Sequence, residues 1–117
     1  MLETGVDIVE IQRIEETVRR HGDRFSKRVF TEGELLQSRG RAESLAARFA
    51  AKEAVFKALG SRVGWRQVEV ERGPTGKPTL LLHGQAAELA RKLGLRSWSV
   101  SLSHSRQYAV AVVVACG

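Results

Sequence analysis

Charged side chains recur one helical turn apart in a segment of the chain, and their types suit the binding of phosphate and metal. The segment runs from Arg48 to Gly60 and reads RFAAKEAVFKALG. At about 100° per residue, Lys52 and Glu53 lie in or beside its apolar face, and Lys57 follows Glu53 by one turn. The apolar face is formed by Leu45, Phe49, Phe56 and Leu59. Because an unpaired buried charge is costly, a carboxylate here requires a cation or a metal.

The same charges also have ordinary interpretations. Glu53 and Lys57 have the spacing of an exposed ion pair on a helix surface. Arg48 and Lys52 are long enough to extend past the phenylalanines into water. The helix alone favours neither these interpretations nor a functional site.

A second acid, Asp7, lies in a segment that is predicted to be a strand. From Thr4 to Ile11 the residues alternate, with Val6 and Ile8 on one face and Asp7 and Val9 on the other. Aspartate is disfavoured inside strands, and such local inconsistencies tend to mark functional sites. A strand end that faces water is the alternative explanation. Gly5 allows another backbone to approach closely at this point.

His104 is the third candidate, because it opens a turn after a strand in which serine alternates with apolar residues. An exposed turn histidine is an equally good interpretation. The spacing of the serines supports no Ser-His-acid triad. The sequence also lacks a Cys/His metal cluster, a phosphate-binding P-loop and a dinucleotide fingerprint.

Basic residues are densest between Arg13 and Arg28, where Asp23 is the only acid from Arg19 onward. The cluster consists of Arg13, Arg19, Arg20, Arg24, Lys27 and Arg28. It is either a solvated surface or a docking surface for an acidic partner.

Composition predicts one domain, residues 1–117, with a net charge of +6. The charge favours an anionic partner. No apolar run is long enough to cross a membrane, and the N-terminus lacks the features of a signal peptide. The only cysteine is Cys116, which suits a reducing cytoplasm.

The elements that position these residues predict an α+β fold with an antiparallel sheet, one long helix and several short helices. The long helix should span 41–59 and end at Gly60. Thr31 and Glu34 fit a capping box at the start of a short helix. Further helices are expected at 10–20, around 25–29 and at 85–93, and a hairpin at 67–72 and 78–83. Strands are expected at 97–103 and 108–115, and the last is apolar on both faces, as in a central or covered strand.

Three of these segments resemble the motifs of one known family. Residues 5–13, GVDIVEIQR, resemble its first motif, 48–60 its second, and SLSH at 101–104 its third. The family is holo-[acyl-carrier-protein] synthase, the short bacterial type of 4′-phosphopantetheinyl transferase. The resemblance extends over nearly the whole chain, and the second motif is the most specific.

The resemblance implies transfer of the 4′-phosphopantetheine arm of coenzyme A to a serine of acyl carrier protein, with release of adenosine 3′,5′-bisphosphate. Asp7 and Glu53 would hold Mg²⁺, and Lys57 would contact the phosphate near the reaction centre. Arg48, Lys52 and His104 match positions that serve coenzyme A phosphates or orient the site. The general base remains open between Glu53, a metal-bound water and another carboxylate.

The resemblance also implies partners and a role. Arg13, Arg24 and Arg28 match positions that dock the acidic carrier protein, and family members of this length are homotrimers with coenzyme A between subunits. The implied role is fatty acid biosynthesis in the cytoplasm, with neither nucleic acid nor membrane as a partner.

Two other functions are compatible with parts of the sequence. A small basic nucleic-acid-binding domain would explain the charge, but aromatic residues are few, no nucleic-acid motif is present and two acids would repel a phosphate backbone. A catalytically idle trimer that only binds acyl carrier protein would not require Asp7, Glu53 and Lys57.

Overall fold

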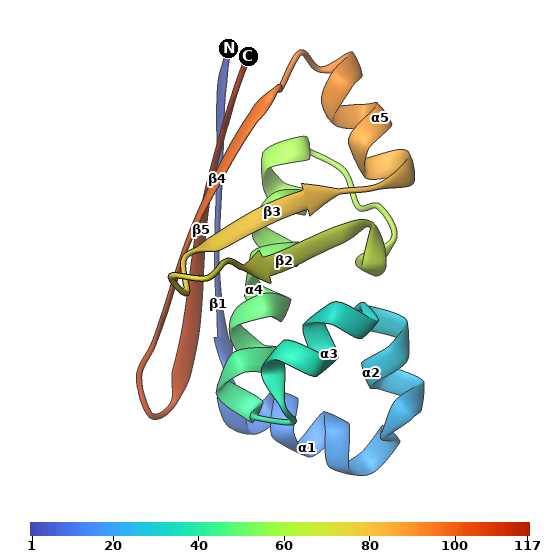
Figure 1. Cartoon of the computed structure of the whole chain (residues 1–117), viewed down its shortest axis with the longest axis vertical. Helices are drawn as coiled ribbons and strands as arrows, with labels where there is room; N and C mark the ends of the chain where they lie inside the picture. Colours follow the sequence, from blue (N-terminus) through green and yellow to red (C-terminus); the bar gives the residue numbers. More distant parts are fainter.

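The computed structural model describes all residues, 1–117, and forms an α+β fold in which one long helix lies between two sheets (Figure 1). The helices are α1 (Ile11–His21), α2 (Asp23–Val29), α3 (Glu32–Ser38), α4 (Ala42–Leu59) and α5 (Gly84–Lys92). The strands are β1 (Leu2–Glu10), β2 (Val68–Arg72), β3 (Pro78–Leu82), β4 (Ser97–His104) and β5 (Tyr108–Cys116). A single 3₁₀ turn, Trp65–Gln67, precedes β2.

The larger sheet has the antiparallel order β1-β5-β4, with β5 at its centre as its two apolar faces predicted. Alternate residues of β5 are buried against α4, and these are Ala109, Ala111, Val113 and Ala115. The small alanines let the sheet lie close to the helix. The serines of β4 (Ser97, Ser99, Ser101 and Ser103) are exposed on the opposite face.

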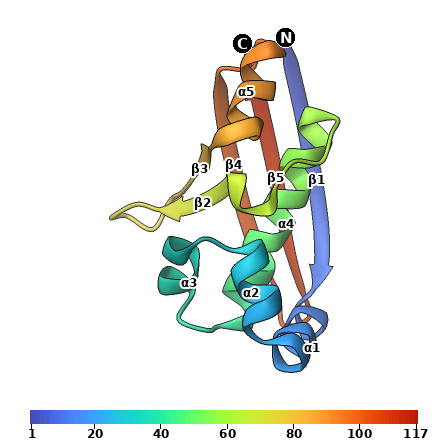
Figure 2. The same ribbon diagram turned by 90° about the vertical axis from the view of Figure 1, so that its right-hand side faces the viewer.

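The long helix α4 is enclosed on several sides. The large sheet covers one side, and the β2–β3 hairpin and the α1–α3 segment cover others (Figure 2). Its many alanines give high helix propensity and fit a crowded interior, and Gly60 ends the helix in the left-handed conformation that glycine adopts readily. The predicted helix at 41–59 is therefore confirmed to within one residue.

The backbones of β1 and α4 approach each other closely at Gly5. A Cβ atom at Gly5 would lie 1.8 Å from the carbonyl oxygen of Ala54, which is closer than any side chain permits. The close backbone approach that the sequence suggested is thus real. It brings the Asp7 end of β1 against the helix that carries Glu53.

The structure corrects several predicted boundaries and one aspect of the sheet. The strands form two antiparallel sheets, because β2 and β3 pair only with each other. Ile11 begins α1 and is not the end of the first strand, and His104 ends β4 and is not part of the turn. The capping box of Thr31 and Glu34 is present. No helix is both long and apolar enough to cross a membrane.

Candidate active site

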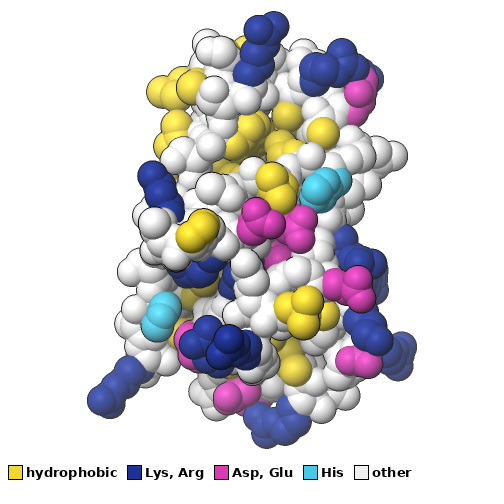
Figure 3. Space-filling model, viewed as in Figure 1, with side chains coloured by type: hydrophobic (Ala, Val, Ile, Leu, Met, Phe, Trp, Pro, Cys, Tyr) yellow, Lys and Arg dark blue, Asp and Glu magenta, His cyan; other side chains and the backbone are white.

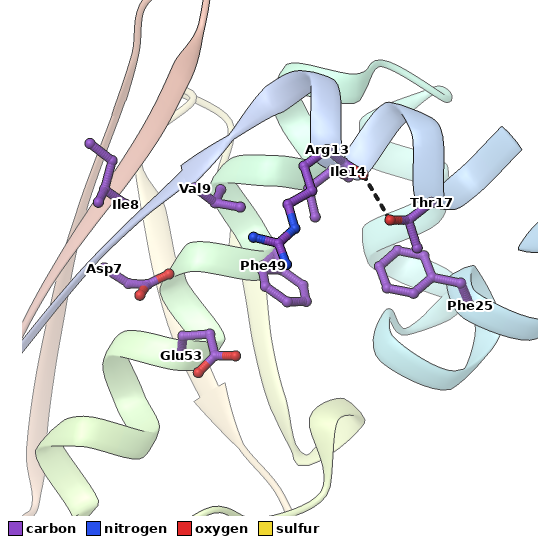
Figure 4. A pocket seen from close by; sticks show the side chains of 9 residues that line it. All are labelled: Asp7, Ile8, Val9, Arg13, Ile14, Thr17, Phe25, Phe49 and Glu53. Carbon is purple, nitrogen blue, oxygen red and sulfur yellow. Dashed lines mark hydrogen bonds between the residues drawn. The ribbon is translucent and has the colours of Figure 1, made fainter. Parts of the chain in front are cut away.

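Asp7 and Glu53 share one pocket, although they come from the first strand and the middle of α4. The pocket has a volume of about 380 Å³ and opens between β1, α1 and α4. Arg13 extends into it from α1, and Phe49 forms part of its apolar side (Figure 4). The remaining lining residues are Ile8, Val9, Ile14, Thr17 and Phe25.

Asp7 is held by a cation from α4. Lys57 Nζ lies 3.3 Å from Asp7 Oδ1 and also donates a hydrogen bond of 2.8 Å to the carbonyl oxygen of Val6. The Asp7 side chain is largely covered, so it is not a strand-end residue that faces water. An acid in a strand is tolerated here because a lysine of the adjacent helix neutralises it.

Glu53 pairs with a different cation. Arg62 Nη2 lies 3.3 Å and 3.5 Å from the two Glu53 carboxylate oxygens. The interpretation of Glu53 and Lys57 as an exposed pair on one helix is therefore wrong, because Lys57 turns to Asp7 instead. Each carboxylate of the pocket thus has its own positively charged neighbour.

Lys52 lies in the interior, and the interpretation that it extends into water is wrong. Its side chain has no exposed surface and pairs with the equally buried Glu34 at 2.7 Å. It also donates hydrogen bonds to the carbonyl oxygens of Trp65 and Val68. Burial lowers the pKa of Lys52 from its ordinary value, and the charge of Glu34 opposes that shift.

Arg48 is also buried, one turn before Lys52, with 1% of its surface exposed. It donates hydrogen bonds to Ser38, Ser44 and Gln37, which hold the start of α4 against α3. Burial lowers the pKa of Arg48 as well, with Glu34 opposing. The structure therefore does not bring Arg48 and Lys52 into the pocket of Asp7 and Glu53, and their predicted contact with coenzyme A stays a prediction.

His104 is exposed at the end of β4 and does not line the pocket of Asp7 and Glu53. Its ring nitrogen Nδ1 lies 3.4 Å from the carbonyl oxygen of Ser105, and it pairs across the sheet with Ala109. Its predicted role at coenzyme A stays a prediction.

The basic surface of α1 and α2 adjoins the pocket. Arg24 and Arg28 line a hollow with His21 and Phe25, and Phe25 also lines the pocket of Asp7 and Glu53. Lys and Arg side chains gather at the lower end of the molecule in Figure 3, where α1 to α3 lie. Because Phe25 lines both hollows, Arg24 and Arg28 lie beside the pocket that Arg13 shares with Asp7 and Glu53.

The donor set of the pocket fits a magnesium ion that also binds a phosphate ligand. The structure contains no group of three or more His, Cys, Asp and Glu residues that would enclose a metal. Mg²⁺ is commonly held by one or two carboxylates, with water and phosphate oxygens completing its octahedron. Asp7 and Glu53 provide that number of carboxylates.

Two ion-pair partners of the predicted site residues were not identified from the sequence: Arg62, the partner of Glu53, and Glu34, the partner of Lys52. Arg62 lies after the helix, and no pattern in the sequence links it to Glu53. Glu34 was identified as half of a capping box, but its second carboxylate oxygen also accepts a hydrogen bond from the backbone of Val70 at 2.8 Å. Its pairing with Lys52 had no local signal, because the two residues meet only in the folded core.

Comparisons with known proteins give a consistent result. A family model described as the 4′-phosphopantetheinyl transferase superfamily matches residues 3–113. The holo-[acyl-carrier-protein] synthase of Herpetosiphon aurantiacus is 53% identical over the full length of both chains. That of Koribacter versatilis is 49% identical over 97% of each.

Solved structures agree with these relatives. The Helicobacter pylori holo-[acyl-carrier-protein] synthase, crystallised in complex with coenzyme A, superposes with a TM-score of 0.88 at 32% identity, covering 97% of this chain and 99% of the other. The Neisseria meningitidis enzyme superposes with a TM-score of 0.89 at 30% identity, covering 98% of each chain.

Proposed function

Because the chain belongs to the 4′-phosphopantetheinyl transferase superfamily, we propose that it transfers the 4′-phosphopantetheine group of coenzyme A to a serine hydroxyl of apo acyl carrier protein. Adenosine 3′,5′-bisphosphate is the second product. The observation that carries the proposal is the pocket in which Asp7 and Glu53 lie together, with Arg13 beside them and Lys57 bound to Asp7.

The residues of the pocket have distinct tasks in this proposal. Phosphoryl transfer depends chiefly on positioning and on neutralising the charge of the phosphates. In this proposal Lys57, which donates a hydrogen bond to the Val6 carbonyl, neutralises a phosphate oxygen of coenzyme A with its ammonium group. Asp7 and Glu53 would hold Mg²⁺, which neutralises the pyrophosphate of coenzyme A when it is bound. The general base that accepts the serine proton remains open between Glu53, a metal-bound water and another carboxylate.

A direct test follows the nucleotide product. The protein is incubated with coenzyme A, apo acyl carrier protein and Mg²⁺, and adenosine 3′,5′-bisphosphate is quantified by chromatography. Release should require the carrier protein, stop on addition of EDTA and resume with excess Mg²⁺. Release that continues undiminished in EDTA would contradict the proposed metal site.

Arg13, Arg24 and Arg28 are proposed to dock the carrier protein, which is acidic along one helix. Opposite charges on two protein surfaces raise the rate of encounter and favour one orientation of the complex. The position of Arg24 and Arg28 beside the pocket supports this, because docking there would bring the carrier serine toward Asp7 and Glu53.

Reversing the charge at Arg24 should therefore weaken use of the carrier. We expect Arg24→Glu to raise KM for acyl carrier protein by about ten-fold, as loss of one well-placed charge contact predicts, and to leave KM for coenzyme A unchanged. Arg96→Glu, an equal charge change at an exposed site before β4, is the control. An unchanged carrier KM for Arg24→Glu would remove this surface from the docking model.

We further propose a homotrimer, with coenzyme A bound between subunits. The outward face of β1 and β5 supports this assembly. It carries a row of exposed apolar side chains, which would be in contact with water in a monomer. The row consists of Leu2, Val6, Ile8, Tyr108, Val112 and Val114. The proposed setting of the enzyme is fatty acid biosynthesis in the cytoplasm.

The row gives a specific test of assembly. Light scattering should report a trimer for the native chain and a smaller species for Val112→Glu, because a carboxylate placed in an apolar interface would lack a partner. Leu36→Glu, which changes an exposed leucine on α3, should leave the mass unchanged. A fully active monomeric native chain would rule out a site between subunits.

A further inference from the structure

Arg62 is bound to the candidate site by a single polar partner. The only hydrogen bonds of its side chain go from Nη2 to the two oxygens of Glu53, and the side chain is 67% exposed. Its guanidinium group also lies over the rings of Phe56 and Trp65, with its central carbon 5.6 Å and 5.7 Å from their centroids. The rings attract the cation and keep it near the pocket.

The two cations of the site differ in how firmly they are held. Lys57 has a second anchor, the Val6 carbonyl, so it can stay in place when the charge of Asp7 is shared with another ligand. Arg62 has no backbone anchor. A divalent cation at the Glu53 carboxylate therefore competes with Arg62 for the same two oxygens, and the neighbouring rings of Phe56 and Trp65 limit how far the guanidinium moves.

A displaced guanidinium is well suited to the other ligand of the site. Its planar set of N–H donors matches two phosphate oxygens at once. With Mg²⁺ on Glu53, the nearest new anion would be the pyrophosphate that the same ion binds.

On this basis, and resting on the proposed function, we infer that Arg62 exchanges partners. It neutralises Glu53 in the free protein, competes there with the divalent cation, and binds a phosphate oxygen of coenzyme A once the cation is in place. Arg62 is thus a further substrate-binding residue of the reaction.

Two binding measurements test the exchange. Mn²⁺ serves as a spectroscopic substitute for Mg²⁺, and its binding to the free protein is measured by electron paramagnetic resonance. Arg62→Ala should bind Mn²⁺ about two- to five-fold more tightly than the native chain, as expected for loss of one exposed competing ion pair. Coenzyme A, titrated by calorimetry with saturating Mg²⁺, should bind Arg62→Ala about three- to ten-fold more weakly.

Matched variants separate this exchange from a general loss of charge. Arg66→Ala removes an exposed arginine that makes no ion pair in the same segment and should change neither affinity. If Glu53→Gln loses Mn²⁺ binding while Arg62→Ala equals the native chain in both titrations, the inference about Arg62 is overturned and the metal site stands. If Glu53→Gln binds Mn²⁺ as the native chain does, the metal site fails and the inference fails with it.

Discussion

Glu53→Gln is expected to reduce the rate of phosphopantetheine transfer by about 10²- to 10³-fold, the effect usual for loss of one preorganised charge-stabilising group. Glutamine keeps the shape of glutamate but lacks the negative charge that a magnesium ion requires. It also removes one of the candidate general bases. Both proposed tasks of Glu53 therefore fail in a variant that differs from the native chain by very few atoms.

The fold should survive this change, which makes the kinetic result interpretable. The Glu53 side chain forms one ion pair, with the exposed Arg62, and such pairs contribute little to stability. Thermal unfolding should therefore shift by only a few degrees at most. Glu43→Gln, on the first turn of the same helix, is the control and should retain activity. Comparable rates for Glu53→Gln and Glu43→Gln would exclude Glu53 from the chemistry.

Lys52→Met is expected to lower the free energy of unfolding by about 3–5 kcal/mol, as found when one partner of a buried ion pair is removed. Lys52 and Glu34 have no exposed surface, and their atoms lie 2.7 Å apart. Without the lysine, Glu34 would retain a buried negative charge, and the carbonyl oxygens of Trp65 and Val68 would lose a donor. The 3₁₀ turn and the start of β2 depend on these contacts.

Urea denaturation of paired variants measures this effect. Lys27→Met breaks an exposed pair with Asp23 and should cost less than about 0.5 kcal/mol. Adding Glu34→Gln to Lys52→Met should cost less than the sum of the two single changes, because it removes the unpaired charge. A loss below 1 kcal/mol for Lys52→Met alone would mean that the contacts of Lys52 with Glu34 of α3 and Val68 of β2 do not stabilise the fold as proposed.

The sequence predicted those parts of the fold that short-range physics determines. The end of α4 at Gly60, the capping box of Thr31 and Glu34 and the β2–β3 hairpin each depend on residues that are close in the chain. Gly5 is different, because its close contact with Ala54 is long-range. The sequence predicted only that another backbone can approach Gly5 closely, and it did not indicate that Ala54 would be the partner.

The pairing of charges in the site was beyond prediction from sequence. A helical wheel places Lys52 beside the apolar face, but whether it reaches water depends on Glu34, which comes from another helix. The same wheel pairs Glu53 with Lys57, whereas the tertiary fold supplies Asp7 to the lysine and Arg62 to the glutamate. When a charged side chain can reach several partners, its actual partner is known only once the positions of the surrounding backbone segments are known.

The central claim is group transfer to a carrier serine, and intact-mass spectrometry of the carrier tests it most directly. Apo acyl carrier protein is incubated with coenzyme A, Mg²⁺ and either the native chain or Glu53→Gln. We expect the native chain to add the mass of one phosphopantetheine, fragmentation to locate it on serine, and the variant to add almost none. A carrier whose mass is unchanged after incubation with the native chain would contradict the account.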